Sequence, residues 1–150
     1  MKIVSSPVYL DTSALAKLYI AEPGSNALEA ALIGRRDLIV SDLAVTELTS
    51  AIARRRREGD LSAAQADRLY RRVVADVSGD EFLRAELTPS VHREAERLLL
   101  RIGAHTPLRA ADALHVATAG ALGARTLVTF DVRLGAAARA FGGLDVLGVS

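Results

Sequence analysis

The chain has 150 residues, of which half are apolar and a quarter are charged, a balance typical of one globular domain over residues 1–150. It contains no cysteine, which excludes disulfides and thiolate chemistry, and its net charge near +1 means that attraction for nucleic acid would need a local basic patch. No apolar stretch reaches the ~18 residues of a membrane span, so we expect a cytoplasmic protein with no membrane partner.

Short apolar segments alternate with helix-type segments along the chain. Strands are expected at 8–10, 37–41, 81–87, 125–131 and 144–149. Helices are expected at 12–20, 25–33, 43–57, 61–77, 88–103, 106–123 and 132–142. Asp42 is a plausible N-cap, and Thr-Pro pairs open the helices expected at 88 and 106. The alternation predicts an α/β fold of three layers, with a short parallel central sheet between helices.

Two acids stand where strands end. Asp11 follows the first strand directly, and Asp131 closes the segment TLVTFD. In open α/β sheets, functional sites form outside the carboxyl ends of the strands. The two carboxylates can therefore lie close together if their strands are neighbours.

Two further acids lie on helices that should be largely buried. Asp112 falls in the first turn of an almost wholly apolar helix, where an unpaired charge would be costly. Glu47 falls at the edge of the core stripe of the helix 43–57, which directs it to the margin of a cleft. Neither placement alone explains why the residue is acidic.

Structural roles compete with functional ones for each of these residues. Asp11 and Asp131 can be N-caps, Asp112 a first-turn acid, and Glu47 a surface residue paired with Arg54. For Asp42 a capping role is favoured over a metal role, and for His115 a place in the core is favoured over ligation, although either can assist a site.

Four segments together resemble the PIN-domain family, and within it the ribonuclease toxins of VapBC toxin–antitoxin pairs. They are VYLDTSAL, SDLAVTELTSAI, LRAADALHVATA and LVTFDVRL, in this order from residue 8 onwards. The resemblance implies a PIN-like fold and places the family's catalytic, metal-binding acids at Asp11, Glu47, Asp112 and Asp131. It gives supporting roles to Ser13 and Thr129.

The resemblance implies a metal-dependent endoribonuclease. Carboxylate ligands without cysteine suit Mg²⁺ or Mn²⁺, and such ions assist the attack of water on a phosphodiester. The implied partners are RNA, a VapB-like antitoxin that neutralises the toxin, and a second copy in a homodimer. Two alternatives stay open: an RNA-processing nuclease without a toxin role, and a catalytically silent PIN-like binding module.

Basic residues offer weaker indications of RNA binding. The run RRRR at 54–57 spreads around its helix, so that Arg54 and Arg55 can guide an RNA backbone or simply end a solvated helix. Arg109 precedes the acidic helix and can face the site.

Overall fold

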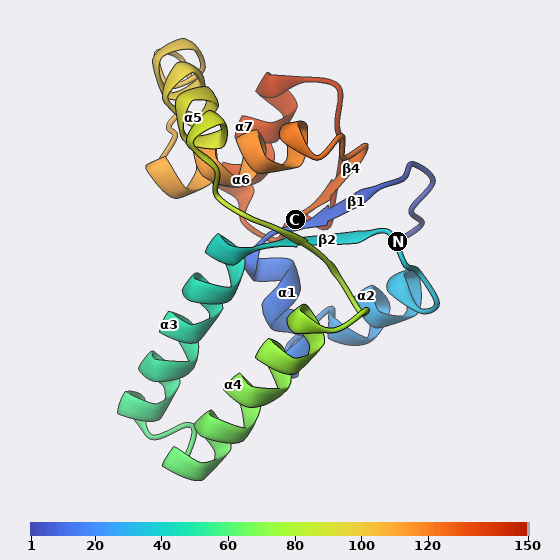
Figure 1. Ribbon diagram of the computed structural model, residues 1–150, viewed down its shortest axis with the longest axis vertical. Coiled ribbons are helices and arrows are strands. Elements are labelled where there is room, and N and C mark those ends of the chain that lie inside the picture. Colours follow the sequence, from blue (N-terminus) through green and yellow to red (C-terminus); the bar gives the residue numbers. More distant parts are fainter. Residues whose placement is uncertain (150) are drawn as a thin grey trace.

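The computed structural model describes residues 1–149, which form five parallel strands and seven helices (Figure 1). The strands are β1 (Val8–Leu10), β2 (Leu38–Ser41), β3 (Leu83–Ala85), β4 (Thr126–Val128) and β5 (Asp145–Leu147). They pair in the order β3-β2-β1-β4-β5, so β1 is central, with β2 on one side and β4 on the other. The prediction of a three-layer α/β fold with a short parallel sheet is confirmed.

Helices cover both faces of this sheet. They are α1 (Thr12–Tyr19), α2 (Ser25–Leu32), α3 (Asp42–Glu58), α4 (Ala63–Ser78), α5 (Pro89–Arg101), α6 (Ala110–Ala121) and α7 (Val132–Phe141). Figure 1 shows α3 and α4 as a hairpin that extends away from the sheet, opposite α5, α6 and α7. Among residues 1–149, no helix has the length and apolarity needed to cross a membrane.

Alternation along the strands divides the core into two clusters. Tyr9, Ile39 and Leu127 point towards α5, α6 and α7, and all three are buried. Their neighbours in the strands, such as Val40 and Val128, point towards α1 to α4. Apolar side chains therefore lie on both faces of the central strands, as parallel strands between two helical layers require.

Two expected helix starts are wrong. The helix expected to open at Thr106 begins at Ala110, because the backbone N–H of Arg109 donates to Asp112 Oδ2 at 3.0 Å and caps the helix there. The N-cap of α3 is Ser41, whose hydroxyl accepts the N–H of Ala44 at 3.1 Å, so Asp42 lies in the first turn instead.

The buried position of Leu127 gives a test of this packing. Leu127 is fully buried on β4, whereas Leu100 on α5 is 83% exposed. We expect Leu127→Ala to lower the free energy of unfolding by about 2–5 kcal/mol, and Leu100→Ala to change it by less than about 0.5 kcal/mol. Urea unfolding followed by circular dichroism measures both, and equal effects would contradict the packing described.

Candidate active site

The four acids named from the sequence line one cavity of about 460 Å³ at the carboxyl edge of the sheet. Asp11 directly follows β1, and Asp131 lies just beyond β4, the strand that pairs with β1. Glu47 comes from the second turn of α3, and Asp112 from the first turn of α6. The strand order reverses beside β1, the point where open α/β sheets form their sites.

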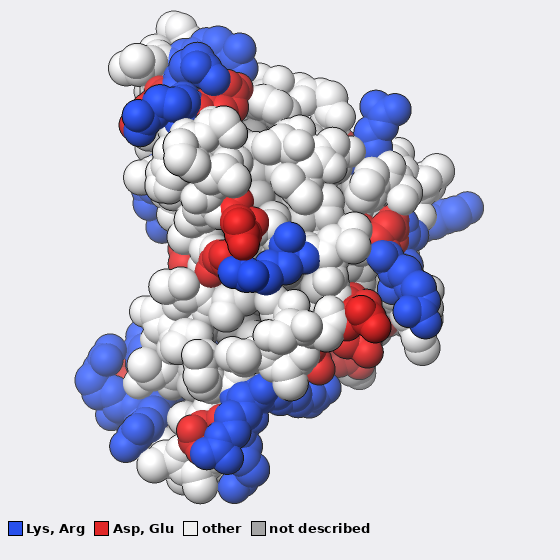
Figure 2. Space-filling model, in the orientation of Figure 1, with Lys and Arg blue, Asp and Glu red and all other residues white. Residues whose placement is uncertain are grey.

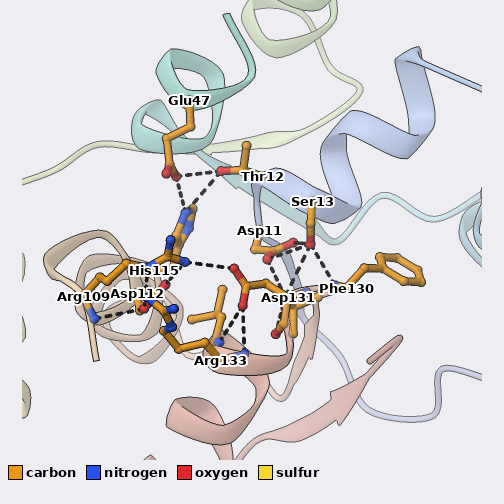
Figure 3. Close-up of polar contacts among 12 residues, drawn as sticks. Asp11, Thr12, Ser13, Glu47, Arg109, Asp112, His115, Phe130, Asp131 and Arg133 are labelled. Atoms are coloured by element: carbon orange, nitrogen blue, oxygen red, sulfur yellow. Dashed lines mark hydrogen bonds and ion pairs between the residues drawn. The ribbon is translucent and has the colours of Figure 1, made fainter. Parts of the chain in front are cut away.

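Hydroxyl groups and a helix N-terminus hold Asp11 in place (Figure 3). The hydroxyl of Ser13 lies 2.7 and 2.9 Å from its two oxygens, and Thr129 donates a short hydrogen bond to Oδ2. Oδ1 also accepts the N–H of Ala14 at 2.8 Å, which makes Asp11 the N-cap of α1. Both hydroxyl residues expected to support the site thus contact Asp11, and the capping role accompanies a place in the cavity.

Asp112 and Asp131 share one cation, the guanidinium of Arg109. Its Nη2 lies 3.3 Å from Asp112 Oδ1 and 3.0 Å from Asp131 Oδ2. Asp131 Oδ1 accepts the N–H groups of Arg133 and Leu134 at 2.8 and 3.2 Å, so Asp131 also caps α7. One oxygen of Asp131 is thereby held by backbone, and the other faces Arg109.

Glu47 is oriented by neighbours that the sequence analysis did not assign to it. Its Oε1 accepts from Thr12 Oγ1 at 2.7 Å and from His115 Nε2 at 2.6 Å. The other ring nitrogen of His115, Nδ1, lies 2.7 Å from the buried hydroxyl of Tyr9, which also contacts Ser41 Oγ at 3.0 Å. A chain of hydrogen bonds thus joins β2, β1, α6 and α3.

The pKa values of Asp11 and Glu47 are shifted in opposite directions, by burial in the first case and by hydrogen bonding in the second. Burial raises the pKa of Asp11, although hydrogen bonds from Thr129, Ala14 and Ser13 oppose this shift. The hydrogen bond from His115 lowers the pKa of Glu47 and outweighs its partial burial. The contact of 2.6 Å between Glu47 Oε1 and His115 Nε2 thus affects both the orientation and the pKa of Glu47.

The donor set suits a hard divalent cation. The acids that line the cavity offer only carboxylate oxygens, the ligand type preferred by Mg²⁺ and Mn²⁺. In the placement described for residues 1–149, no three acidic or histidine side chains are close enough to hold one ion together. Arg109 stands between two of the acids, so cation binding there requires the side chains to close around the ion in its place.

The remaining predicted residues fall in different places. Arg54, Arg55 and Arg109 all line the cavity, and Arg55 forms an ion pair with Glu22 at 2.8 Å. Asp42 does not line it; its carboxylate pairs with Arg84 instead, at 2.7 and 2.9 Å.

His115 lies in the core, the role favoured for it, and it also supports a residue of the cavity. Its ring is buried, as expected of a core histidine, and it also contacts Glu47 at the cavity. The spacing of three residues from Asp112 placed it on the same helix face, which was the available signal. Contact with Glu47, 68 residues away, is a tertiary property that no local pattern encodes.

Comparison with known proteins identifies the family of the chain. The family model of the PIN domain matches residues 8–140, so the chain belongs to the PIN-domain family. It is 36% identical over 143 residues to ribonuclease VapC45 of Mycobacterium tuberculosis, covering 90% of this chain and 91% of that protein.

Solved structures share the fold at lower sequence identity. The crystal structure of Mycobacterium tuberculosis VapC20, described as a sarcin–ricin loop cleaving toxin, has a TM-score of 0.71 at 17% identity and covers 87% of this chain and 95% of that one. A chain of a toxin–antitoxin complex from Klebsiella pneumoniae has a TM-score of 0.66 at 17% identity, and the match covers 95% of this chain and 97% of that one.

The chain of hydrogen bonds through His115 can be tested by unfolding. We expect His115→Ala to lower the free energy of unfolding by about 1–3 kcal/mol, because buried Tyr9 and the Glu47 carboxylate both lose a partner. In a double-mutant cycle with Tyr9→Phe, the coupling energy should be about 0.5–3 kcal/mol. The exposed His92 of α5 is the matched control, and His92→Ala should have an effect within about 0.5 kcal/mol. Additive effects of the two site variants would contradict the contact.

Proposed function

We propose that this chain is an endoribonuclease that uses Mg²⁺ or Mn²⁺ to hydrolyse RNA phosphodiester bonds. We further propose that it acts as the toxin of a VapBC-type pair. The observation that carries the first proposal is the convergence of Asp11, Glu47, Asp112 and Asp131 on one cavity in a PIN-domain chain. The similarity to ribonuclease VapC45 over nine-tenths of both chains supports it.

The four acids would hold the cation, and the other residues of the site would hold the acids. When bound, the cation would polarise the phosphodiester and make water a better nucleophile at neutral pH. Ser13 and Thr129 fix the orientation of Asp11, while Thr12 and His115 fix Oε1 of Glu47. Because these donors approach Glu47 at Oε1, its Oε2 would be available to a cation.

Basic side chains near the cavity would receive the RNA backbone. Arg54 and Lys17 line the cavity together with the acids, and the neighbouring Glu22 holds Lys17 at 3.3 Å and Arg55 at 2.8 Å. Figure 2 shows further Lys and Arg atoms gathered over the far ends of α3 and α4. Positive charge beyond the acids attracts phosphates and offsets the repulsion that the carboxylates exert on them.

The proposed partners follow from the same relatives. The structural similarity to a chain of a toxin–antitoxin complex supports a VapB-like antitoxin as the neutralising partner. The family resemblance supports a homodimer. An antitoxin that covers the cavity would block both RNA and cation, because both enter at the carboxyl edge of the sheet.

Substitution of Asp11 tests the proposal most simply. Asp11→Asn keeps the shape of the side chain but removes its charge. We therefore expect the rate of cleavage of single-stranded RNA with Mg²⁺ or Mn²⁺ to fall by more than about 100-fold. Loss of a residue that only orients a metal ligand typically lowers activity by about 10- to 100-fold. The matched control is Asp60→Asn, at an exposed position outside the cavity, with cleavage close to that of the wild type.

The same variant reports on its own folding. An acid whose pKa is raised in the folded state loses stability as pH rises through the interval between its ordinary and its folded pKa. At neutral pH the charge of Asp11 therefore lowers stability. We expect Asp11→Asn to keep or raise Tm in thermal unfolding, because the amide is neutral and no charge is buried at this position. A folded variant that cleaves like the wild type would refute the nuclease assignment, and a wild type that binds RNA without cleaving it would favour a binding module.

A further inference from the structure

Arg109 holds the N-terminus of α6 and reaches across the acidic cluster. Its backbone is extended at the N-cap position, and its side chain, 56% exposed, turns back over the first turn of the helix (Figure 3). All the hydrogen bonds to the Asp112 carboxylate found in residues 1–149 come from Arg109, through its backbone N–H, Nε and Nη2. Asp112 is 3% exposed, so it depends on this one residue.

A single nitrogen atom of Arg109 bridges two acids from different helices. Nη2 donates to Asp112 Oδ1 at 3.3 Å and to Asp131 Oδ2 at 3.0 Å. These oxygens can be no farther apart than the sum of the two distances, with a positively charged group between them. A divalent cation held by both Asp112 and Asp131 would compete with this guanidinium for their carboxylates.

The other two acids have no such bridge. Asp11 accepts from hydroxyl groups and a backbone N–H, all of them neutral donors, and Glu47 accepts from Thr12 and His115. Arg109 is thus the one arginine or lysine in residues 1–149 whose side chain pairs with any of the four acids. Hydrogen bonding to Asp112 and the charges of both acids raise its pKa further, so the guanidinium stays charged.

We propose that Arg109 is an internal counter-ion that occupies the place of the cation and competes with Mg²⁺ or Mn²⁺ for Asp112 and Asp131. This inference rests on the proposed function, because it takes these acids to be cation ligands. Like charges cannot share the same pair of oxygens at contact distance, so binding of the cation requires the guanidinium to leave.

The surroundings of Arg109 allow it to leave. More than half of its side chain is already exposed, so turning outwards uncovers little apolar surface. A second cavity of about 560 Å³, lined by Arg109, Thr106, Pro107 and Val132, lies next to Asp131. Without a cation, the single charge of Arg109 therefore offsets part of the charge of Asp112 and Asp131, and it is exchanged for an ion when one binds.

Binding of Mn²⁺ measured by calorimetry tests the proposal without reference to activity. We expect Arg109→Ala to tighten the Kd for Mn²⁺ by about five- to a hundredfold, the usual coupling between two competing events. Arg133→Ala is the matched control: it removes the same charge from the start of α7, where only the backbone N–H of Arg133 contacts Asp131. Its effect should be much smaller at 0.15 M salt, because screening weakens charges that are not in contact.

Thermal unfolding gives a second readout on the same proteins. Without cation, Arg109→Ala should lower Tm, because buried Asp112 loses the two side-chain donors of Arg109 and keeps only the backbone N–H. Mn²⁺ should then raise Tm more than it does in the wild type. Arg109→Lys keeps the charge but lacks the planar guanidinium, so it should tighten Mn²⁺ binding by a smaller factor than Arg109→Ala. This variant replaces Arg109→Ala in both measurements if the alanine variant does not fold.

Three outcomes would overturn the proposal, and they separate it from the nuclease assignment. Unchanged or weaker Mn²⁺ binding by the Arg109 variants, with normal binding by the wild type, refutes the competition alone. Equal tightening of Mn²⁺ binding in Arg133→Ala shows a general effect of charge. This result also refutes the competition proposal and leaves the nuclease assignment standing. A wild type that binds no Mn²⁺ and cleaves no RNA refutes both proposals.

Discussion

Four carboxylates crowded at one edge of a buried parallel sheet repel one another, and the structure around them is arranged to hold them there. Each carboxylate accepts hydrogen bonds from backbone or side-chain groups around it, so none is left without a partner. Among residues 1–149, no buried side-chain nitrogen or oxygen lacks a partner. Burial of Asp11 still has a cost, because it raises the pKa of that carboxyl despite its hydrogen bonds.

The scaffold supplies those donors mostly through helix N-termini. Asp11 and Asp131 cap α1 and α7, and Asp112 accepts the N–H that starts α6. Free N–H groups at a helix start favour negative charge, so three of the four acids occupy positions that the backbone itself stabilises. Glu47 lies within α3 and has no such support, so it depends on Thr12 and on the chain through His115 and Tyr9. For Asp11 and Asp131, the same carboxylate both caps a helix and lines the cavity.

Much of the fold follows from local pattern, because strand–helix alternation and apolar strands specify a parallel sheet. Asp11 and Asp131 could be placed because they follow strands, and Ser13 and Thr129 because the family resemblance aligns them. Contacts between distant elements could not be predicted: the bridge of Arg109 between Asp112 and Asp131, and the contact of His115 with Glu47. The late start of α6 has the same origin, since Asp112 captures the N–H of Arg109 and overrides the Thr-Pro signal at 106.

The account depends on these carboxylates being a cation site whose charge Arg109 balances until an ion arrives. A crystal grown with Mn²⁺, examined by anomalous diffraction, tests this most directly. The account predicts an anomalous peak in contact with carboxylate oxygens of the four acids, Asp112 and Asp131 among them, with the guanidinium of Arg109 turned away from these two. A map at millimolar Mn²⁺ without such a peak, and with Arg109 still bridging Asp112 and Asp131, would contradict it.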